Sequence, residues 1–301
     1  MVEYPLKTRK QFLLETQNRD GGWGYFPGKQ SWLEPTVYAA LALQGTPAAG
    51  RVRDLLNSWA LADGGWRATA AIPDPCWAMS LAVTLCSVNR WDDPALYRGV
   101  SLLERTIGAE GSFIFQLNSR VHREITDLDF SLQGWPWRPG TTSWIEPTAH
   151  AIIALRNVTR FLGERQVPKY AGLMRRIEIA EQMLLGRRAA DGGWNYGSRQ
   201  AWGINLPSYP ETTALALIGL RGNPTLDVTS SLEVAGRQFA ETKSALARAW
   251  LTIALNLYAV PIRAVAPESR PSQDIMLAAL QCLAFEDAGR AFFHRIEGVA
   301  Q

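Results

Sequence analysis

The chain has 301 residues, of which 47% are hydrophobic, so it is long enough to bury a large core. Its 31 basic and 28 acidic residues nearly cancel, and no long run of one sign occurs. This balance argues against a nucleic-acid-binding surface.

Neither the N-terminal segment nor the cysteines point to export. The first residues lack the apolar run of a signal peptide, and no window approaches the roughly eighteen uninterrupted apolar residues of a membrane span. Cys76, Cys86 and Cys282 lie in apolar stretches without C-x-x-C spacing, which is typical of reduced, buried thiols. We therefore expect a cytoplasmic protein with at most a peripheral membrane contact and no structural zinc.

The first predicted elements are a helix, a turn and a second helix. A helix expected over residues 5–17 ends at Asp20-Gly21-Gly22, because glycine tolerates the positive φ that a helix end requires. After a loop, Glu34 begins a helix over 34–44, in which Pro35 suits the first turn. This order predicts a helical hairpin.

The same order recurs along the chain. The stretch SWLEPTVYAALAL at 31–43 returns as SWIEPTAHAIIAL at 143–155, with eight of thirteen positions identical. A turn ending in tryptophan precedes each acid-started helix, as DGGW at Trp23, Trp66 and Trp194 and as GWPW at Trp137. The acids that begin the helices are Glu34, Asp74, Glu146 and Glu211. A fixed order repeated in this way indicates an array of helical hairpins.

The remaining elements extend this array. Helices are predicted over 51–61, 74–88, 94–107, 146–158, 170–185, 211–220, 226–240 and 245–259 and after 273, or about twelve helices in about six hairpins. Residues 108–142 break the pattern, and long insertions in repeat proteins often lie on one rim and carry function.

The two helices of each hairpin differ in composition. The acid-started helices are rich in apolar and small residues, whereas their partners carry charged residues such as Arg51, Arg53, Arg175 and Arg176. This difference favours inner helices packed on both sides and outer helices facing solvent. We predict an all-α fold, a single α/α-toroid domain over 1–301 with its insertion at the rim.

The run RKQFLLETQNRDGGW resembles the Gln-Trp repeat of squalene-hopene and oxidosqualene cyclases, with Gln17, Gly22 and Trp23 at the matching places. PETTALALIGL at 210–220 looks like the start of an inner helix in the same terpenoid cyclase and protein prenyltransferase superfamily, whose members carry prenyltransferase/squalene oxidase repeats. The resemblance spans about Thr8 to Leu255. It implies an α/α toroid and an isoprenoid substrate, although one toroid hosts several chemistries.

The catalytic motifs of that superfamily are mostly missing. The resemblance places the proton-donating middle residue of the Asp-x-Asp-Asp-Thr-Ala motif on Glu211, but both flanking aspartates are absent. His122, His150 and His294 have no cysteine or acid at the spacing of the prenyltransferase zinc site. The standard squalene-type protonation and zinc chemistry are therefore not indicated.

The four acids are the main candidate catalytic residues. If the inner helices run parallel around a ring, Glu34, Asp74, Glu146 and Glu211 gather at one mouth of a central cavity. There they could donate a proton, stabilise a cation or bind a divalent metal. The alternative is that each acid only stabilises the N-terminus of its helix, where negative charge is favourable.

Two further sets of residues are candidates. Asp127 and Asp129 in the insertion could bind Mg²⁺, although Asp-x-Asp also makes turns. Candidate substrate-binding residues are predicted near the acids: Trp32, Trp144, Trp202, Tyr209, Trp135, Trp137 and His150. The alternatives are loop clamping for tryptophans, which we expect of Trp23, Trp66 and Trp194, and a core position for His150.

We therefore expect a terpene-cyclase-like protein that acts on an isoprenoid or similar apolar chain, with Glu211 as the first choice of acid and Mg²⁺ as the one cofactor considered. The alternative is a non-catalytic toroid that binds a lipid, a polyprenyl chain or a protein partner.

Overall fold

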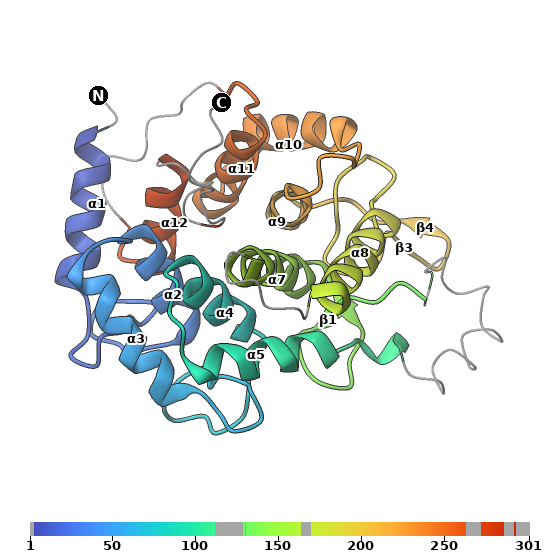
Figure 1. Ribbon diagram of the computed structural model, residues 1–301. Coiled ribbons are helices and arrows are strands. Elements are labelled where there is room, and N and C mark those ends of the chain that lie inside the picture. Colours follow the sequence, from blue (N-terminus) through green and yellow to red (C-terminus); the bar gives the residue numbers. More distant parts are fainter. Residues whose placement is uncertain are drawn as a thin grey trace. The chain divides into compact units, whose positions relative to one another are not determined.

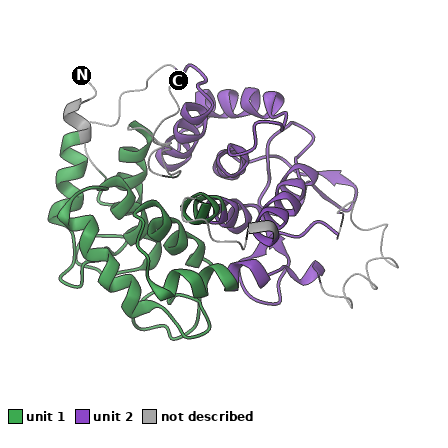
Figure 2. Cartoon of the chain, in the orientation of Figure 1, with its two compact units in different colours: residues 1–101, 156–167, 263–301 green, residues 102–155, 168–262 purple. Residues whose placement is uncertain are grey.

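The computed structural model describes residues 3–111, 129, 131–163, 170–262, 272–285 and 292. The described chain is mainly helical (Figure 1). It divides into two compact units, each assembled from separate stretches of sequence (Figure 2). Unit 1 contains residues 1–101, 156–167 and 263–301, and unit 2 contains residues 102–155 and 168–262.

The helices follow the predicted order. Unit 1 contains α1 (Glu3–Glu15), α2 (Leu33–Ala42), α3 (Pro47–Trp59), α4 (Met79–Val88), most of α5 (Pro94–Arg105) and α12 (Ile275–Phe285). Unit 2 contains the 3-10 turn η1 (Ala109–Gly111), the first part of α7 (Ile145–Gly163), α8 (Tyr170–Gly186), α9 (Pro210–Leu220), α10 (Thr229–Glu241) and α11 (Ala245–Leu257). Two short antiparallel ribbons also lie there, β1 (Trp135–Pro136) with β2 (Ser143–Trp144) and β3 (Gln200–Ala201) with β4 (Ile204–Asn205).

One predicted helix start is wrong. The helix expected from Asp74 begins at Met79. The residues before it are extended instead, because Arg67 forms a β-bridge with Pro75 and the Cys76 backbone N–H donates to the Trp66 carbonyl at 2.9 Å. Backbone groups engaged in this pairing cannot also begin a helix.

Each residue of the Asp-Gly-Gly-Trp turn has a structural role. In the first copy, the Asp20 carboxylate accepts from the Gly22 N–H at 2.9 Å, and Gly21 has φ +88°. A Cβ on Gly22 would lie 2.6 Å from the Leu55 side chain, so the second glycine is required by packing. The copies at Asp63 and Asp191 make the same bond from carboxylate to glycine.

The tryptophan of each turn is hydrogen-bonded to the helix before it, and in three of the four turns also to the helix after it. Each indole N–H donates to a carbonyl of the preceding helix, with distances of 2.6 to 3.0 Å for the pairs Trp23–Leu13, Trp66–Leu56, Trp135–Leu103 and Trp194–Leu184. The backbone N–H groups of three of them donate to a threonine hydroxyl of the following helix, in the pairs Trp23–Thr36, Trp135–Thr148 and Trp194–Thr213. In these three turns the tryptophan is therefore a clamp with one bond to each helix.

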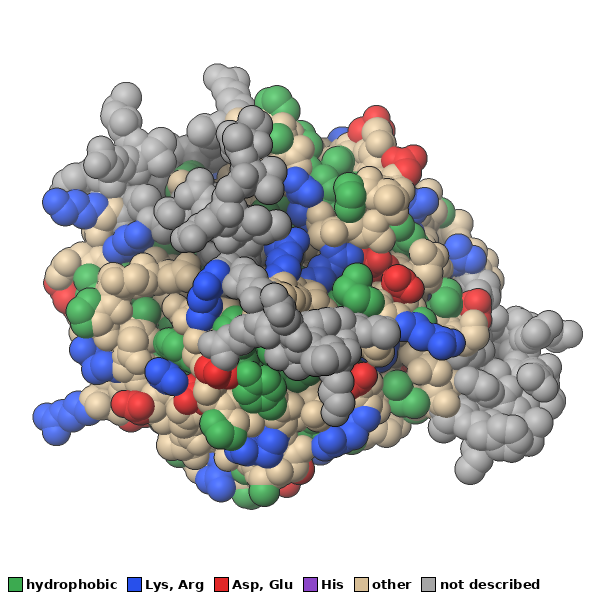
Figure 3. All heavy atoms as spheres, viewed as in Figure 1, with side chains coloured by type: hydrophobic (Ala, Val, Ile, Leu, Met, Phe, Trp, Pro, Cys, Tyr) green, Lys and Arg blue, Asp and Glu red, His purple; other side chains and the backbone are tan. Residues whose placement is uncertain are grey.

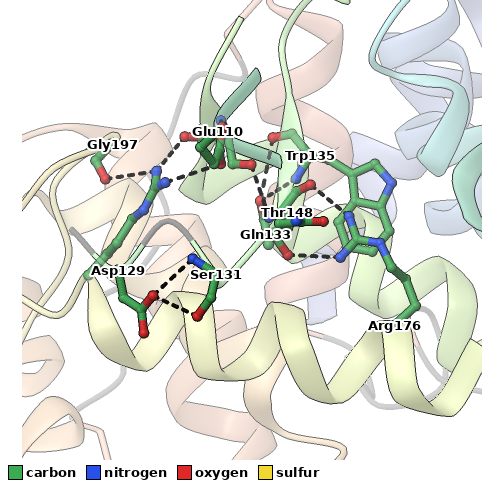
Figure 4. Close-up of polar contacts among 11 residues, drawn as sticks. Glu110, Asp129, Ser131, Gln133, Trp135, Thr148, Arg176 and Gly197 are labelled. Atoms are coloured by element: carbon green, nitrogen blue, oxygen red, sulfur yellow. Dashed lines mark hydrogen bonds and ion pairs between the residues drawn. The ribbon is translucent and has the colours of Figure 1, made fainter. Parts of the chain in front are cut away.

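The degenerate third turn uses Trp135 in this clamp, whereas the sequence pattern had placed Trp137 there. Arg176 supports the turn (Figure 4): its guanidinium lies 3.6 Å from the Trp135 ring centroid and donates to the carbonyls of Gln133, Gly134 and Thr106. The prediction that Arg176 faces solvent is wrong, since it is 8% exposed, and burial lowers the pKa of its guanidinium to about 10. Arg51, Arg53 and Arg175 are exposed as predicted.

A buried ion pair fixes the same region (Figure 4). Arg187 lies 3.3 Å from the Glu110 carboxylate and also donates to the carbonyls of Ser143 and Gly197. Glu110 in turn accepts from the Ser143 backbone N–H. The charges thereby hold η1, β2 and the end of α8 together.

The last described helix packs against the first hairpin. Within unit 1, α12 contacts both α1 and α2, and these segments lie side by side in Figure 1. The Ile275 N–H donates to the Tyr25 carbonyl at 2.9 Å, and Leu33–Ala68 and Ile145–Tyr196 form the equivalent bonds. Within unit 1, the C-terminal helix thus contacts the first turn in the way that α2 and α7 contact the turn that follows each of them.

The surface agrees with the charge analysis. Lys and Arg side chains are spread over the face seen in Figure 3, with acidic and apolar side chains between them. Among the described helices, none is long and apolar enough to cross a membrane.

The clamp makes a prediction about stability. Trp23→Phe removes the buried hydrogen bond to the Leu13 carbonyl and leaves part of the space of the indole empty, so the free energy of unfolding should fall by about 2 to 4 kcal/mol. Trp202→Phe, at an exposed tryptophan, is the matched control and should change it by less than about 0.5 kcal/mol. Urea denaturation measures both, and equal small effects would contradict the clamp.

Candidate functional site

Three glutamates occupy the same place in the first turn of an inner helix. They are Glu34 in α2, Glu146 in α7 and Glu211 in α9. The N-cap residues of α2 and α9 are Trp32 and Tyr209, and neither side chain makes a capping hydrogen bond. Trp144 precedes Glu146 by the same two positions, so each glutamate lies two residues after an aromatic residue.

Asp74 does not share this register. The Cys76 N–H donates to the Trp66 carbonyl, as the Trp32 N–H does to the Trp23 carbonyl. Cys76 therefore corresponds to Trp32, and the residue that corresponds to Glu34 is Ala78. Asp74 is exposed in the extended segment before α4.

In unit 1, Glu34 is paired with a phenol. The Tyr25 hydroxyl donates to its carboxylate at 2.5 Å, and the Tyr25 ring lies 6.0 Å from the Trp32 ring. Burial raises the pKa of Glu34, the hydrogen bond from Tyr25 counteracts part of this rise, and Asp274 adds to it. Burial and the Glu34 charge also raise the pKa of Tyr25, so the phenol remains a donor. Glu34 is thus a carboxyl group that retains its proton to a higher pH than an ordinary glutamate, as a general acid requires.

Cys76 lies close enough to Glu34 for the charge of the carboxylate to contribute to a raised pKa of the Cys76 thiol. Burial, above all, raises the pKa of its thiol to about 11, which leaves it uncharged near neutral pH.

In unit 2, the charges of two glutamates contribute to a raised pKa of Tyr196. The pKa of Tyr196 is raised by partial burial, then by Glu211, Tyr209 and Glu146. The rings of Tyr196 and Tyr209 lie 5.0 Å apart. The Trp144 indole lies beside Gly197, where a Cβ would be 3.5 Å from the ring. Unit 2 therefore gathers two predicted acids with exposed aromatic rings.

The four predicted acids are divided between the units. Glu34 and Asp74 belong to unit 1, and Glu146 and Glu211 belong to unit 2. Their gathering at one shared mouth stays a prediction.

The other candidate aromatic residues have varied settings. Trp202 is 79% exposed at the tip of the β3–β4 ribbon, next to Gly203, and has φ +54°. Trp137 is half-buried. Trp135 is buried in the clamp described above, which gives it a packing role.

His150 lies in the core of unit 2. It is 1% exposed, and its ring lies 6.1 Å from that of Trp250. Burial lowers the pKa of its imidazole to about 3, so the ring is neutral near pH 7.

Asp129 is the member of the predicted Asp127–Asp129 metal site that lies among the described residues. Asp129 is exposed, and its carboxylate accepts from the backbone N–H and the hydroxyl of Ser131, which forms a turn (Figure 4). Its predicted partner Asp127 lies outside the described residues, as do His122 and Glu124. Within the described ranges, no three His, Cys, Asp or Glu side chains are grouped to hold a metal ion.

Two residues of the site were not predicted from the sequence. Tyr25 and Tyr196 each follow a clamp tryptophan by two positions, in WGY and WNY. Each lies near the glutamate of its own hairpin and an acid of another element, namely Asp274 for Tyr25 and Glu146 for Tyr196. The repeated W-x-Y spacing was the signal that could have identified them.

Comparison with solved structures places this geometry in a fold. Type II terpene cyclase MstE from Scytonema, in complex with geranylgeranyl dihydroxybenzoate, matches with a TM-score of 0.55 and 15% identity over 93% of this chain and 76% of the cyclase chain. Its apo form matches with a TM-score of 0.55 and 17% identity over 94% and 77%. Endoglucanase Cel10 from Klebsiella pneumoniae, a family 8 glycosyl hydrolase, matches with a TM-score of 0.55 and 14% identity over 94% of this chain and 99% of its own.

No family model and no curated protein sequence matches the chain. At these identities the structural likeness shows the fold alone. The chain has the all-α, α/α-toroid fold that is shared by a terpene cyclase and a glycosyl hydrolase.

The Tyr25–Glu34 hydrogen bond predicts a pKa change. Tyr25→Phe removes the donor that stabilises the carboxylate, so the pKa of Glu34 should rise further above its wild-type value. Carboxyl ¹³C chemical shifts, assigned with Glu34→Gln, measure this pKa. A matched control is Tyr97→Phe, at an exposed tyrosine of α5 that hydrogen-bonds Asp92. A fall in the pKa of Glu34 in Tyr25→Phe would contradict the assigned bond.

Because burial lowers the pKa of His150, the free energy of unfolding should depend on pH. The unfolded chain binds a proton at this residue below about pH 6.5, whereas the folded chain does not until about pH 3. The contribution of His150 to stability should therefore be complete above pH 6.5 and fall toward pH 3, by at most about 1.4 kcal/mol per pH unit. The free energy of unfolding of His150→Leu should fall less steeply with acid. An imidazole NMR signal of His150, identified by its loss in His150→Leu, that titrates near pH 6.5 in the folded protein would refute this prediction.

Proposed function

We propose that this protein is a terpene-cyclase-like enzyme that protonates an isoprenoid or similar apolar chain. The observation that carries the proposal is the Glu34 carboxyl group, whose pKa is raised by burial and which is held by the Tyr25 phenol at 2.5 Å. The fold shared with a type II terpene cyclase supports the choice of substrate class.

The proposed step begins with protonated Glu34. The O–H bond of its carboxyl group breaks as a C–H bond forms at one carbon of a substrate double bond, and the other carbon becomes a carbocation. The hydrogen bond from Tyr25 stabilises the carboxylate that remains. Ring closure follows when another double bond of the same chain attacks the cation, and loss of a proton to a carboxylate or water ends the reaction.

Glu34 is preferred to Glu211 as the acid because burial raises its pKa and a defined donor orients it. Within unit 2, Glu146 and Glu211 with Tyr196 and Tyr209 form a second set of carboxylates and aromatic faces, of the kind that favours positive charge.

A non-catalytic binding protein is the second candidate. The observation that favours it is the sequence around Glu211, Tyr-Pro-Glu-Thr-Thr-Ala, which lacks both aspartates that flank the acid in the cyclase motif. Such a protein would hold the same apolar chain, or a lipid, without turnover.

Product analysis tests the proposal. The purified protein is incubated with squalene, farnesyl and geranylgeranyl substrates, with and without Mg²⁺, and the organic extract is analysed for cyclic products. Glu34→Gln should lower the rate by about 100-fold or more, because the amide cannot donate a carboxylic proton. Glu178→Gln, at an exposed glutamate of α8, is the matched control and should keep the wild-type rate.

Two other outcomes of this experiment would change the proposal. Substrate binding without products from any substrate would support the binding protein. Loss of activity in Glu211→Gln with full activity in Glu34→Gln would transfer the acid role to Glu211.

A further inference from the structure

A groove in unit 1 lies outside the residues assigned above. It has a volume of about 650 Å³, within the usual range for small-molecule sites. One wall comes from the first turn and loop, with Arg19, Lys29 and Gln30, and the other comes from the second loop, with Thr69, Ala70 and Ala71. Trp59 also lines the groove.

Hydrogen bonds hold the first wall in shape. The Asn18 amide donates to the Lys29 carbonyl and to the Ser31 hydroxyl oxygen, both at 2.9 Å. The Ser31 hydroxyl donates to Asp20 at 2.8 Å, and the same carboxylate oxygen accepts from the Gly22 N–H. The Asn18, Asp20 and Ser31 side chains are therefore engaged within the loop.

A backbone bond ties the two walls together. The Leu33 N–H donates to the Ala68 carbonyl at 2.8 Å, directly beside Ser31 on one wall and Thr69 on the other. Because these hydrogen bonds already fix the loops of both walls, ordering the loops costs little additional conformational entropy when a ligand binds.

The groups left for a ligand are mainly cations and hydrogen-bond donors. Arg19 and Lys29 are exposed, and neither side chain forms an ion pair or hydrogen bond with the described part of the chain. Gln30 adds an exposed amide, and the nearly buried Thr69 adds a hydroxyl group. The Asp20 charge leaves the groove with a formal excess of one positive charge.

We propose that this groove binds a small organic molecule that carries a phosphate or diphosphate group. Arginine and lysine are the usual phosphate ligands, since a guanidinium donates two parallel hydrogen bonds and an ammonium supplies a concentrated charge. Trp59, Ala70 and Ala71 provide an apolar surface for the carbon part of a phosphate ester. None of these residues belongs to the proposed acid site, so the two proposals stand or fall separately.

Calorimetric titration with pyrophosphate tests the site. The wild-type protein should bind it with about 1:1 stoichiometry, and the double variant Arg19→Gln/Lys29→Gln should bind at least about 10-fold more weakly. The matched control is Arg175→Gln/Lys243→Gln, which removes two exposed cations in unit 2 and should keep the wild-type affinity. Circular dichroism verifies that both variants fold.

The source of the phosphate is resolved by two further arms, inorganic phosphate and vesicles that contain phosphatidic acid. Binding of pyrophosphate that is stronger than binding of either supports a soluble phosphate ester, whereas stronger binding of vesicles supports a lipid headgroup at the same residues. No binding of any of the three probes would overturn the proposal. Equal weakening in the two double variants would also overturn it, because it would show non-specific attraction to the net charge.

Discussion

The indole N–H bond from each turn tryptophan to the preceding helix is the interaction on which the rest of the structure depends. It fixes where the chain leaves the outer helix, and the threonine bond fixes where the inner helix begins. Because both bonds are buried, breaking either leaves an unpaired polar group in the core. The glycines before the tryptophan are a consequence of this arrangement, since one needs a positive φ and the other has no room for a side chain.

The clamp also positions the candidate site. A fixed helix start places an aromatic residue at the N-cap and a glutamate within the first turn, as Trp32 and Glu34 show. The same turn delivers Tyr25 or Tyr196 to that glutamate two residues after the tryptophan. Packing elements and candidate site residues therefore belong to one repeated unit. Such a unit can diverge in chemistry while its helices stay in place, as expected for a fold shared by a cyclase and a glycosyl hydrolase.

The third turn shows how the architecture tolerates a degenerate sequence. It lacks the Asp-Gly-Gly run, and the Gly134 N–H donates to the Ser143 hydroxyl oxygen instead of to an aspartate. The stacked guanidinium of Arg176 donates to the carbonyls of Gln133 and Gly134. The Glu110–Arg187 pair likewise satisfies the Ser143 backbone, whose N–H donates to Glu110 and whose carbonyl accepts from Arg187. Buried charges are costly unless they are hydrogen-bonded or paired, and each guanidinium donates to two or more carbonyls, although Arg176 Nε has no hydrogen-bond partner among the described residues.

The sequence by itself determined the helix order, most helix bounds, the glycine and tryptophan roles and the acid position of Glu34, Glu146 and Glu211, because these follow from local periodicity and turn chemistry. Only the tertiary structure decided that Asp74 lies outside that register, that Arg176 is buried and that Tyr25 meets Glu34. These facts depend on contacts between segments far apart in the chain or on the backbone pairing of a turn, which the local pattern of apolar and polar residues does not encode. Burial, which separates Glu34 from an ordinary surface glutamate, is likewise a property of the packed chain.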